Sequence, residues 1–207
     1  MTVLEQAGAT LRSGSVPGGM AGKTPGVPET PPAAPGRLQL TPQEIEGPYF
    51  RLGAPQRSDL LEPGDKPGIV IAGRVLNELG TPIWGAIVYF WSSDAVGNYD
   101  MLGYRYTGWV ITDDQGRYEV TTIVPGCYQP RHAKHIHVKV QGVSSPITTQ
   151  LYIDGEPGNE EDDYYNPAMV VPWEADASGV KRGTFDFVIR QVTPLENVTP
   201  ESLAATV

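Results

Sequence analysis

The sequence predicts an all-β fold, an antiparallel β-sandwich whose long loops carry the functional residues. Among the 207 residues are 24 Gly and 20 Pro, a combined share well above the roughly 12% of an average protein, which favours many turns. Between these turns, apolar residues recur at every second position over short segments, the pattern of half-buried strands. Repeated short strands with few helical segments are typical of a sandwich.

The expected elements follow one another at short intervals. A short helix is expected to begin at Thr41-Pro42-Gln43-Glu44, because a capping threonine with proline in the first turn and glutamate three residues on is a helix-start signature. The segment Asp113-Asp114-Gln115-Gly116 is expected to turn a hairpin. The predicted strands cover residues 69–76, 86–91, 110–112, 117–123, 134–140, 148–153 and 184–190.

Composition divides the chain into one domain and two tails. Residues 13–36 hold six Pro and six Gly and few large apolar side chains, so burial cannot offset the entropic cost of ordering this segment. We therefore expect a flexible N-terminal tail over 1–38 and a second tail over 193–207. The sandwich domain is expected over 39–192, a length that suits a single domain.

Charge and cysteine content narrow the possible functions. The net charge is −9, and a chain this acidic without a basic stripe suits neither nucleic acid nor an anionic membrane surface. The longest apolar run, 86–91, is far shorter than the about 20 residues of a membrane span. The single cysteine excludes an internal disulfide and a cysteine-rich metal site. Residues 1–6 show no signal peptide, so we expect a cytoplasmic protein, with export left open if a leader has been replaced.

All three histidines lie within six residues, at His132, His135 and His137. Because His135 and His137 are two residues apart on a predicted strand, their side chains leave the same face and can converge on one metal ion. The alternative is an ordinary half-exposed strand, since apolar residues alternate with polar ones throughout 134–140.

Two tyrosines in loop-like positions strengthen the metal hypothesis. Tyr99 closes the segment 94–99, and Tyr128 follows Pro125-Gly-Cys. Phenolate is a hard oxygen ligand, and together with imidazole it suits ferric iron better than zinc. A bound cation lowers the pKa of its ligand, so tyrosine can bind as phenolate near neutral pH. For each tyrosine taken alone, the alternative is a packed aromatic at the rim or in the core.

A series of motifs follows in one order along about residues 40–190. It comprises Leu40-Thr-Pro-Gln-Glu-Ile-Glu-Gly-Pro-Tyr49, Gly80-Thr-Pro-Ile-Trp-Gly-Ala86, Trp91-Ser-Ser-Asp-Ala-Val-Gly-Asn-Tyr99, Thr112-Asp-Asp-Gln-Gly-Arg-Tyr118, Pro125-Gly-Cys-Tyr128, His135-Ile-His137 and Thr149-Gln150-Leu-Tyr152. The middle turns occur in many non-catalytic sandwiches, whereas the order Gly-Pro-Tyr, tyrosine, Pro-Gly-x-Tyr, His-x-His is specific. The series resembles the intradiol ring-cleavage dioxygenases, the family of protocatechuate 3,4-dioxygenase and catechol 1,2-dioxygenase, in their compact form.

The resemblance implies a mononuclear non-haem Fe(III) centre with four protein ligands. Tyr99 would be the equatorial tyrosinate and Tyr128 the axial tyrosinate that substrate displaces. His135 and His137 would be the imidazole ligands.

The resemblance also implies an arginine and a glutamine near the reacting ring. Gln150 corresponds to the glutamine. Arg131 is the best match to the arginine, but it lies four residues before His135, where three is usual in the family. His132 stands at the usual position and is the alternative for this role. Tyr49 is expected to line the mouth of the substrate pocket.

The implied activity is the insertion of both atoms of dioxygen into a small catecholic aromatic. The ring is cleaved between its two hydroxyl-bearing carbons to a cis,cis-muconate-type diacid. Catechol and dioxygen are the expected partners, and assembly into a homo-oligomer is left open. One alternative is a catalytically inactive binding module of the same lineage, which the displaced arginine favours. The other is a zinc or copper site at the histidines.

Two further features carry weaker hypotheses. Cys127 has histidines nearby in sequence, as a thiol nucleophile requires, although a lone turn cysteine is more often a bystander. The run 154–163 holds six acidic residues, but it lacks the spacing of a calcium-binding loop. We interpret this run as a solvated loop.

Overall fold

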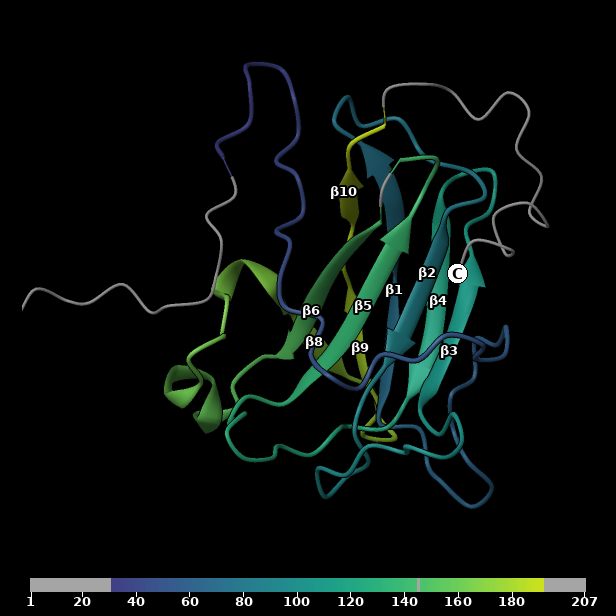
Figure 1. The fold of residues 1–207 in the computed structure, drawn as a ribbon, viewed down its shortest axis with the longest axis vertical. Helices are drawn as coiled ribbons and strands as arrows, with labels where there is room; N and C mark the ends of the chain where they lie inside the picture. Colours follow the sequence, from purple (N-terminus) through teal and green to yellow (C-terminus); the bar gives the residue numbers. More distant parts are fainter. Residues whose placement is uncertain (1–30, 145, 192–207) are drawn as a thin grey trace, which may run out of the picture.

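The structure, a computed structural model, describes residues 31–144 and 146–191. Two five-stranded sheets pack face to face around one apolar core (Figure 1). The predicted sandwich is therefore confirmed. The tail expected over 193–207 lies outside the described residues, as does most of the tail expected over 1–38.

The first sheet is built on β1, which pairs with β4 on one side and with β9 and β10 in succession on the other. Its strands are β1 (Ile69–Asn77), β4 (Arg117–Thr122), β8 (Trp173–Ala175), β9 (Lys181–Thr184) and β10 (Phe187–Ile189). The second sheet has the order β3-β2-β5-β6-β7. Its strands are β2 (Ile87–Trp91), β3 (Thr107–Ile111), β5 (His135–Gln141), β6 (Ile147–Ile153) and β7 (Val170–Val171).

Most of the long ladders are antiparallel as predicted, but β1–β9, β1–β10 and β6–β7 are parallel pairs. Alternation of apolar residues reports which face is buried and not the direction of the neighbouring strand, so the sequence could not show this. The strand predicted over 184–190 is also divided between β9 and β10. Gly73 of β1 permits the crossing between them, because a side chain there would collide with the Phe185 carbonyl.

The helix predicted from Thr41 is wrong, because this segment runs extended across both sheets. The Thr41 N–H donates to the Val188 carbonyl at 2.9 Å, and the Glu44 N–H donates to the Thr148 carbonyl at 2.8 Å. The Thr41 hydroxyl, expected to cap a helix, accepts from the Val188 N–H instead. Long-range pairing therefore overrides a local capping pattern.

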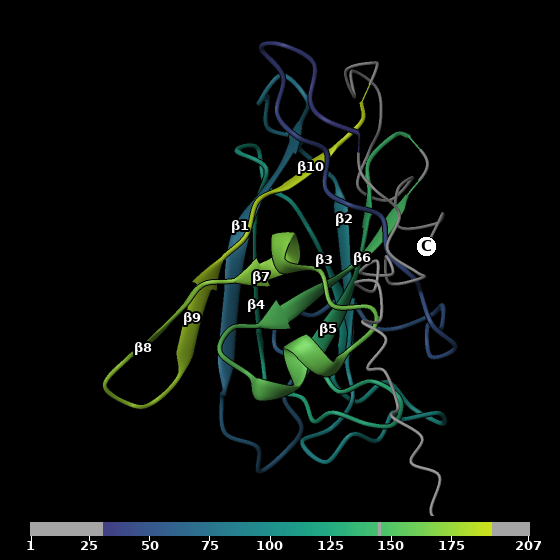
Figure 2. The same ribbon diagram turned by 90° about the vertical axis from the view of Figure 1, so that its left-hand side faces the viewer.

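Helical structure among the described residues is confined to two short 3-10 turns, η1 (Pro157–Glu161) and η2 (Pro167–Met169). Both belong to the segment that crosses from β6 in the second sheet to β8 in the first (Figure 2). Within residues 31–144 and 146–191, no helix is long and apolar enough to span a bilayer.

The two faces of β5 carry different chemistry. Ile136 and Val138 point into the core between the sheets, while His135 and His137 point to the other face, away from the first sheet. That second face is not solvated, because the segment 49–54 and the aromatic residues of β2 cover it with a smaller apolar cluster. Both histidines are consequently only 1% exposed.

Candidate active site

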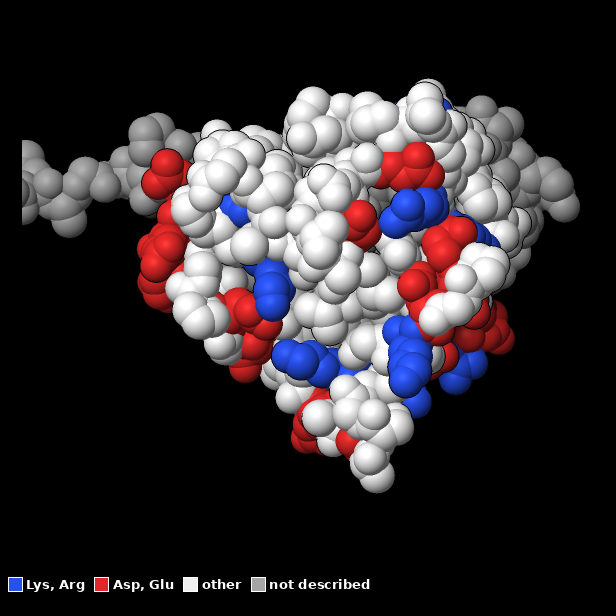
Figure 3. All heavy atoms as spheres, turned by 90° about the horizontal axis from the view of Figure 1, so that it is seen from below, with Lys and Arg blue, Asp and Glu red and all other residues white. Residues whose placement is uncertain are grey.

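The predicted site residues gather at the end of the sandwich where β5 begins, the lower end in Figure 1. Three parts of the chain meet there: the segment 41–54, the β2–β3 loop with Tyr99, and the β4–β5 loop with Tyr128 and Arg131. Seen from below, this end has an uncharged middle with acidic and basic side chains around it (Figure 3).

The His135 ring is oriented by a backbone carbonyl that lies just before β5. Its Nδ1 lies 2.7 Å from the Ala133 carbonyl, which can only accept, so Nδ1 carries the proton and Nε2 keeps its lone pair. Burial, together with the positive charge of Arg131, lowers the pKa of His135 to about 3. The imidazole is therefore neutral, the form that binds metals.

His137 is stacked on Trp91, with ring centroids 4.9 Å apart and planes within 8°. Among the described residues, neither of its ring nitrogens has a hydrogen-bond partner. Burial, and then the neighbouring His135 and Arg131, hold its pKa well below the ordinary value. Burying a polar group without a hydrogen-bond partner costs free energy. A metal ion bound to a ring nitrogen of His137 would remove this cost.

The three predicted site tyrosines form one cluster beside the histidines. Tyr99 is stacked on Tyr49 at 4.0 Å between centroids and meets Tyr128 edge-on at 5.5 Å. The Tyr99 ring lies 6.2 Å from that of His137, and the Tyr128 ring lies 6.0 Å from that of His135. Each predicted phenol ligand thus has a predicted imidazole ligand as its neighbour.

The phenols of Tyr99 and Tyr128 are neutral in the absence of a cation. Burial and the adjacent Tyr128 raise the pKa of Tyr99 above its ordinary value, and burial likewise raises the pKa of Tyr128 although Arg131 opposes it. The Tyr99 hydroxyl is buried without a hydrogen bond of acceptable geometry to any described residue.

Arg131 is buried beside His135 and Gln150 and is not a solvated loop charge. Its side chain is 4% exposed, and Nε donates to both carboxylate oxygens of Asp162 at 3.0 Å. Nη2 donates to Gln150 Oε1 at 2.8 Å, and Nη1 lies 3.3 Å from His135 Nε2. His132, the alternative for the same role, is 37% exposed and lies beside Glu161, outside the cluster.

Both polar atoms of the Gln150 side-chain amide form hydrogen bonds. It lies opposite His137 in the β5–β6 register, and its Nε2 donates to the Ile45 carbonyl at 3.0 Å while Oε1 accepts from Arg131. The segment that precedes Tyr49 therefore helps to orient Gln150.

The structure adds four residues that sequence analysis did not identify. Asp162 falls within the acidic run 154–163, and the interpretation of that run as solvated is wrong at this position. Burial alone would raise the pKa of Asp162, but hydrogen bonds from the Ala133 and Tyr164 N–H groups and the charge of Arg131 lower it. The other three residues are Glu44, Trp91 and Tyr152, each less than 9% exposed. Cys127 stays exposed.

The donor set fits a ferric ion. Two neutral imidazoles and two phenols converge, and three buried polar atoms of these residues, His137 Nδ1 and Nε2 and Tyr99 Oη, have no hydrogen-bond partner among the described residues. Two imidazoles alone do not complete a structural four-ligand site, and phenol oxygens are hard donors that favour trivalent iron over zinc.

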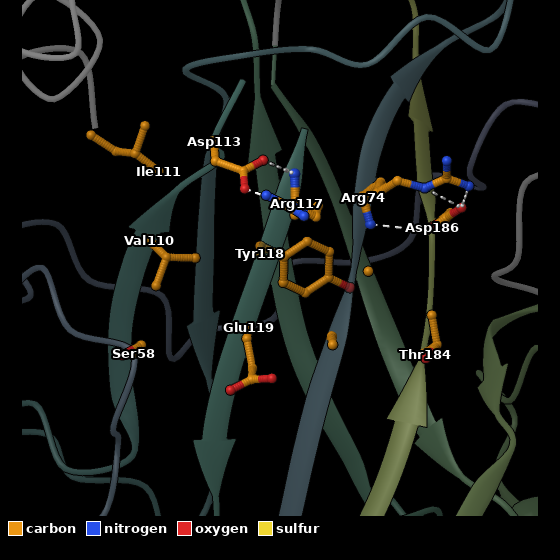
Figure 4. Close-up of a pocket in the computed structure, with 12 residues that line it drawn as sticks. Ser58, Arg74, Val110, Ile111, Asp113, Arg117, Tyr118, Glu119, Thr184 and Asp186 are labelled. Carbon is orange, nitrogen blue, oxygen red and sulfur yellow. Dashed lines mark hydrogen bonds and ion pairs between the residues drawn. The ribbon is translucent and has the colours of Figure 1, made fainter. Parts of the chain in front are cut away.

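A cavity of about 610 Å³ lies over the first sheet (Figure 4) and shares no residue with this cluster. Four of its five charged side chains form two ion pairs, Arg74 with Asp186 and Arg117 with Asp113, both at 2.7 Å, and the fifth is Glu119. Tyr118 donates its hydroxyl proton to the Phe185 carbonyl. None of the buried side-chain polar atoms that lack a hydrogen-bond partner among the described residues belongs to the lining of this cavity.

Comparison with known proteins agrees with the geometry. The profile of the family described as Dioxygenase matches residues 45–190. Chlorocatechol 1,2-dioxygenase of Pseudomonas putida is 30% identical over 184 residues, covering 75% of this chain and 70% of the relative. The dioxygenase domain of a dioxygenase carbohydrate-binding protein fusion from Streptomyces sp. SirexAA-E is 38% identical, with a TM-score of 0.69 over 74% of this chain and all of that domain. Chlorocatechol 1,2-dioxygenase from Pseudomonas putida superposes with a TM-score of 0.64 at 29% identity, over 72% of each chain. The chain belongs to the intradiol ring-cleavage dioxygenase family.

Proposed function

We propose that this intradiol dioxygenase holds one Fe(III) ion and acts on a small catecholic compound. Both atoms of dioxygen enter the substrate, and the ring opens between its hydroxyl-bearing carbons to a cis,cis-muconate-type diacid. The single observation that carries the proposal is the convergence of two neutral imidazoles and two phenols where β5 begins, with donor atoms of His137 and Tyr99 that have no partner among the described residues. The catechol and chlorocatechol 1,2-dioxygenases among its relatives support a catecholic substrate.

Tyr99, Tyr128, His135 and His137 would hold the metal. Bound there, Fe(III) would supply Lewis acidity, drawing electron density from a catechol chelated through both oxygens. The neutral imidazoles are already in their ligating form, and the stacking of Trp91 on His137 fixes the plane of that ring.

Tyr128 would accept a proton from the substrate. Because burial raises the pKa of its free phenol, Tyr128 Oη would accept and hold a proton from a catechol hydroxyl when it is not bound to the metal. Tyr128 would thereby act as the general base that lets the catechol bind as an anion.

Arg131 would stabilise negative charge on the substrate. Its guanidinium is fixed by Asp162 on one side and Gln150 on the other, so it does not need to reorganise when charge develops on the ring. Tyr49, stacked on Tyr99, limits the access of water to that phenol.

Turnover in isotopically labelled dioxygen tests the function. We expect mass spectrometry of the diacid product to show both labelled atoms, and Tyr99→Phe to abolish product formation. A protein that binds catechol without consuming dioxygen would instead support the inactive binding module. Activity with zinc or copper in place of iron, unaffected by Tyr99→Phe, would support a histidine-only site.

A further inference from the structure

Glu44 places a buried carboxyl group next to the site. Its side chain lies against β6, where the Glu44 N–H donates to the Thr148 carbonyl, and the residue is only 8% exposed. Glu44 Oε2 lies 3.2 Å from the Tyr152 hydroxyl oxygen. Glu44 Oε1 is buried without a hydrogen-bond partner among the described residues, an arrangement that penalises a charged carboxylate.

The Tyr152 hydroxyl has one proton and three neighbouring acceptors. Its oxygen lies 2.6 Å from the Tyr164 carbonyl, 3.2 Å from Glu44 Oε2 and 3.4 Å from Gln150 Oε1. A carbonyl can only accept, and it is the nearest of the three, so the Tyr152 proton goes to Tyr164. A hydrogen bond between Glu44 and Tyr152 then requires that the proton be supplied by Glu44.

The charges around Glu44 agree with a protonated acid. Burial raises the pKa of Glu44 to about 7, outweighing the opposing effects of Asn166, Tyr152 and Arg131. Arg131 does not hold Glu44 ionised because its guanidinium is already paired with Asp162. Tyr152 is the other titratable group in contact, and burial raises its own pKa above the ordinary value.

The Tyr152–Tyr164 hydrogen bond anchors the segment that holds Arg131. The Tyr164 N–H donates to Asp162 Oδ1 at 2.9 Å, and the Arg131 guanidinium lies 5.0 Å from the centre of the Tyr164 ring. Displacement of the Tyr164 carbonyl would therefore move both the carboxylate and the aromatic ring that fix Arg131.

We propose that Glu44 is a positioning residue that works as a neutral carboxylic acid. Its proton binds the Tyr152 oxygen, and this leaves the Tyr152 proton for the Tyr164 carbonyl. When Glu44 loses its proton, the carboxylate competes for the Tyr152 proton, and the Tyr164 segment loses its anchor. The inference rests on the proposed function in so far as Arg131 acts on a catecholic substrate.

The pH dependence of kcat/KM for catechol cleavage tests the role in turnover. We expect the wild-type value to fall as the pH rises through the pKa of Glu44. In Glu44→Gln the side-chain amide donates to Tyr152 at every pH. This variant should therefore keep the kcat/KM that wild-type protein has at low pH, without the decrease at higher pH. Glu46→Gln is the matched control, because Glu46 is two residues away, pairs with Lys139 on the outside and should keep the wild-type profile. An unchanged profile in Glu44→Gln, or an inactive Glu44→Gln protein with full iron content, would overturn the proposal.

Infrared difference spectroscopy tests the protonation state without turnover. Protein brought from acidic to alkaline pH should lose the carbonyl band of a buried carboxylic acid, and this loss should be absent in Glu44→Gln. Should that variant not fold, Tyr152→Phe serves instead, because removal of the hydroxyl should shift the same band. Absence of the band in wild-type protein would overturn the role of Glu44, whether or not the protein cleaves catechol. Presence of the band without ring cleavage would contradict the proposed function alone.

Discussion

Two regions of the molecule bring charged side chains together, and they differ in burial. Over the first sheet, the pairs Arg74–Asp186 and Arg117–Asp113 leave 31% to 64% of each side chain exposed. At the end of the sandwich where β5 begins, Arg131 and Asp162 are 4% and 0% exposed. Surface pairs contribute little free energy, whereas a buried charge that loses its partner is strongly destabilising. Burial, and not the proximity of charges, distinguishes the site from the cavity over the first sheet.

The largest expected effect is the loss of a histidine ligand. His137→Ala should abolish iron binding and ring cleavage, because it removes an imidazole from the proposed set of four ligands. Arg74→Ala, in the other region, should leave both unchanged. Iron content by elemental analysis and catechol turnover check the two variants, and full iron occupancy in His137→Ala would contradict the four-ligand site.

Matched aspartate substitutions compare the two ion pairs directly. Asp162→Asn should lower the free energy of unfolding by about 3–5 kcal/mol, because it leaves the buried Arg131 charge without its counterion. Asp186→Asn should lower it by less than about 1 kcal/mol. Denaturant unfolding of iron-free protein measures both, and equal losses would show that burial does not separate the regions.

The stability of the buried region should depend on pH through Glu44. Its folded-state pKa of about 7 lies above the ordinary value of 4.5, so the folded state binds the proton more tightly than the unfolded state. The resulting stabilisation is fully present below pH 4.5 and is lost as the pH rises through 7, a change of about 3 kcal/mol. Thermal unfolding should show this loss in wild-type protein and in Glu46→Gln. If Glu44→Gln lost as much stability as wild-type protein between pH 4.5 and 7, a group other than Glu44 would be responsible for the loss.

The smallest effect is expected beside the site, at Cys127. Cys127→Ser should leave colour and turnover unchanged because the thiol is exposed. Its neighbour Tyr128→Phe should weaken iron binding, change the colour and slow turnover. Visible spectra of the two variants make the comparison, and an unchanged spectrum in Tyr128→Phe would remove Tyr128 from the ligand set.

The alternation of apolar and polar residues predicted the part of the fold that matters most for the site. It placed His135 and His137 on one face of a strand, and the structure has them there, opposite the core residue Ile136. The pattern could not show that this face is covered, because the covering segment 49–54 lies far away in the sequence.

Contacts between distant segments account for what the sequence did not reveal. Asp162 is one of several acidic residues in a run, and only its contact with Arg131 distinguishes it from its solvated neighbours. Glu44 belonged to an expected helix start, and its buried position arises from pairing with β6. The one-residue offset of Arg131 similarly left His132 as an alternative, because only the fold shows that Arg131 is buried beside Gln150 and that His132 is partly exposed beside Glu161.

The visible absorption spectrum of the purified protein, before and after anaerobic addition of catechol, tests the central claim most directly. The account predicts a charge-transfer band from tyrosinate bound to Fe(III), with a shift to lower energy when catechol chelates the metal. A protein that stays colourless after reconstitution with Fe(III) would show that Tyr99, Tyr128, His135 and His137 do not form a ferric site.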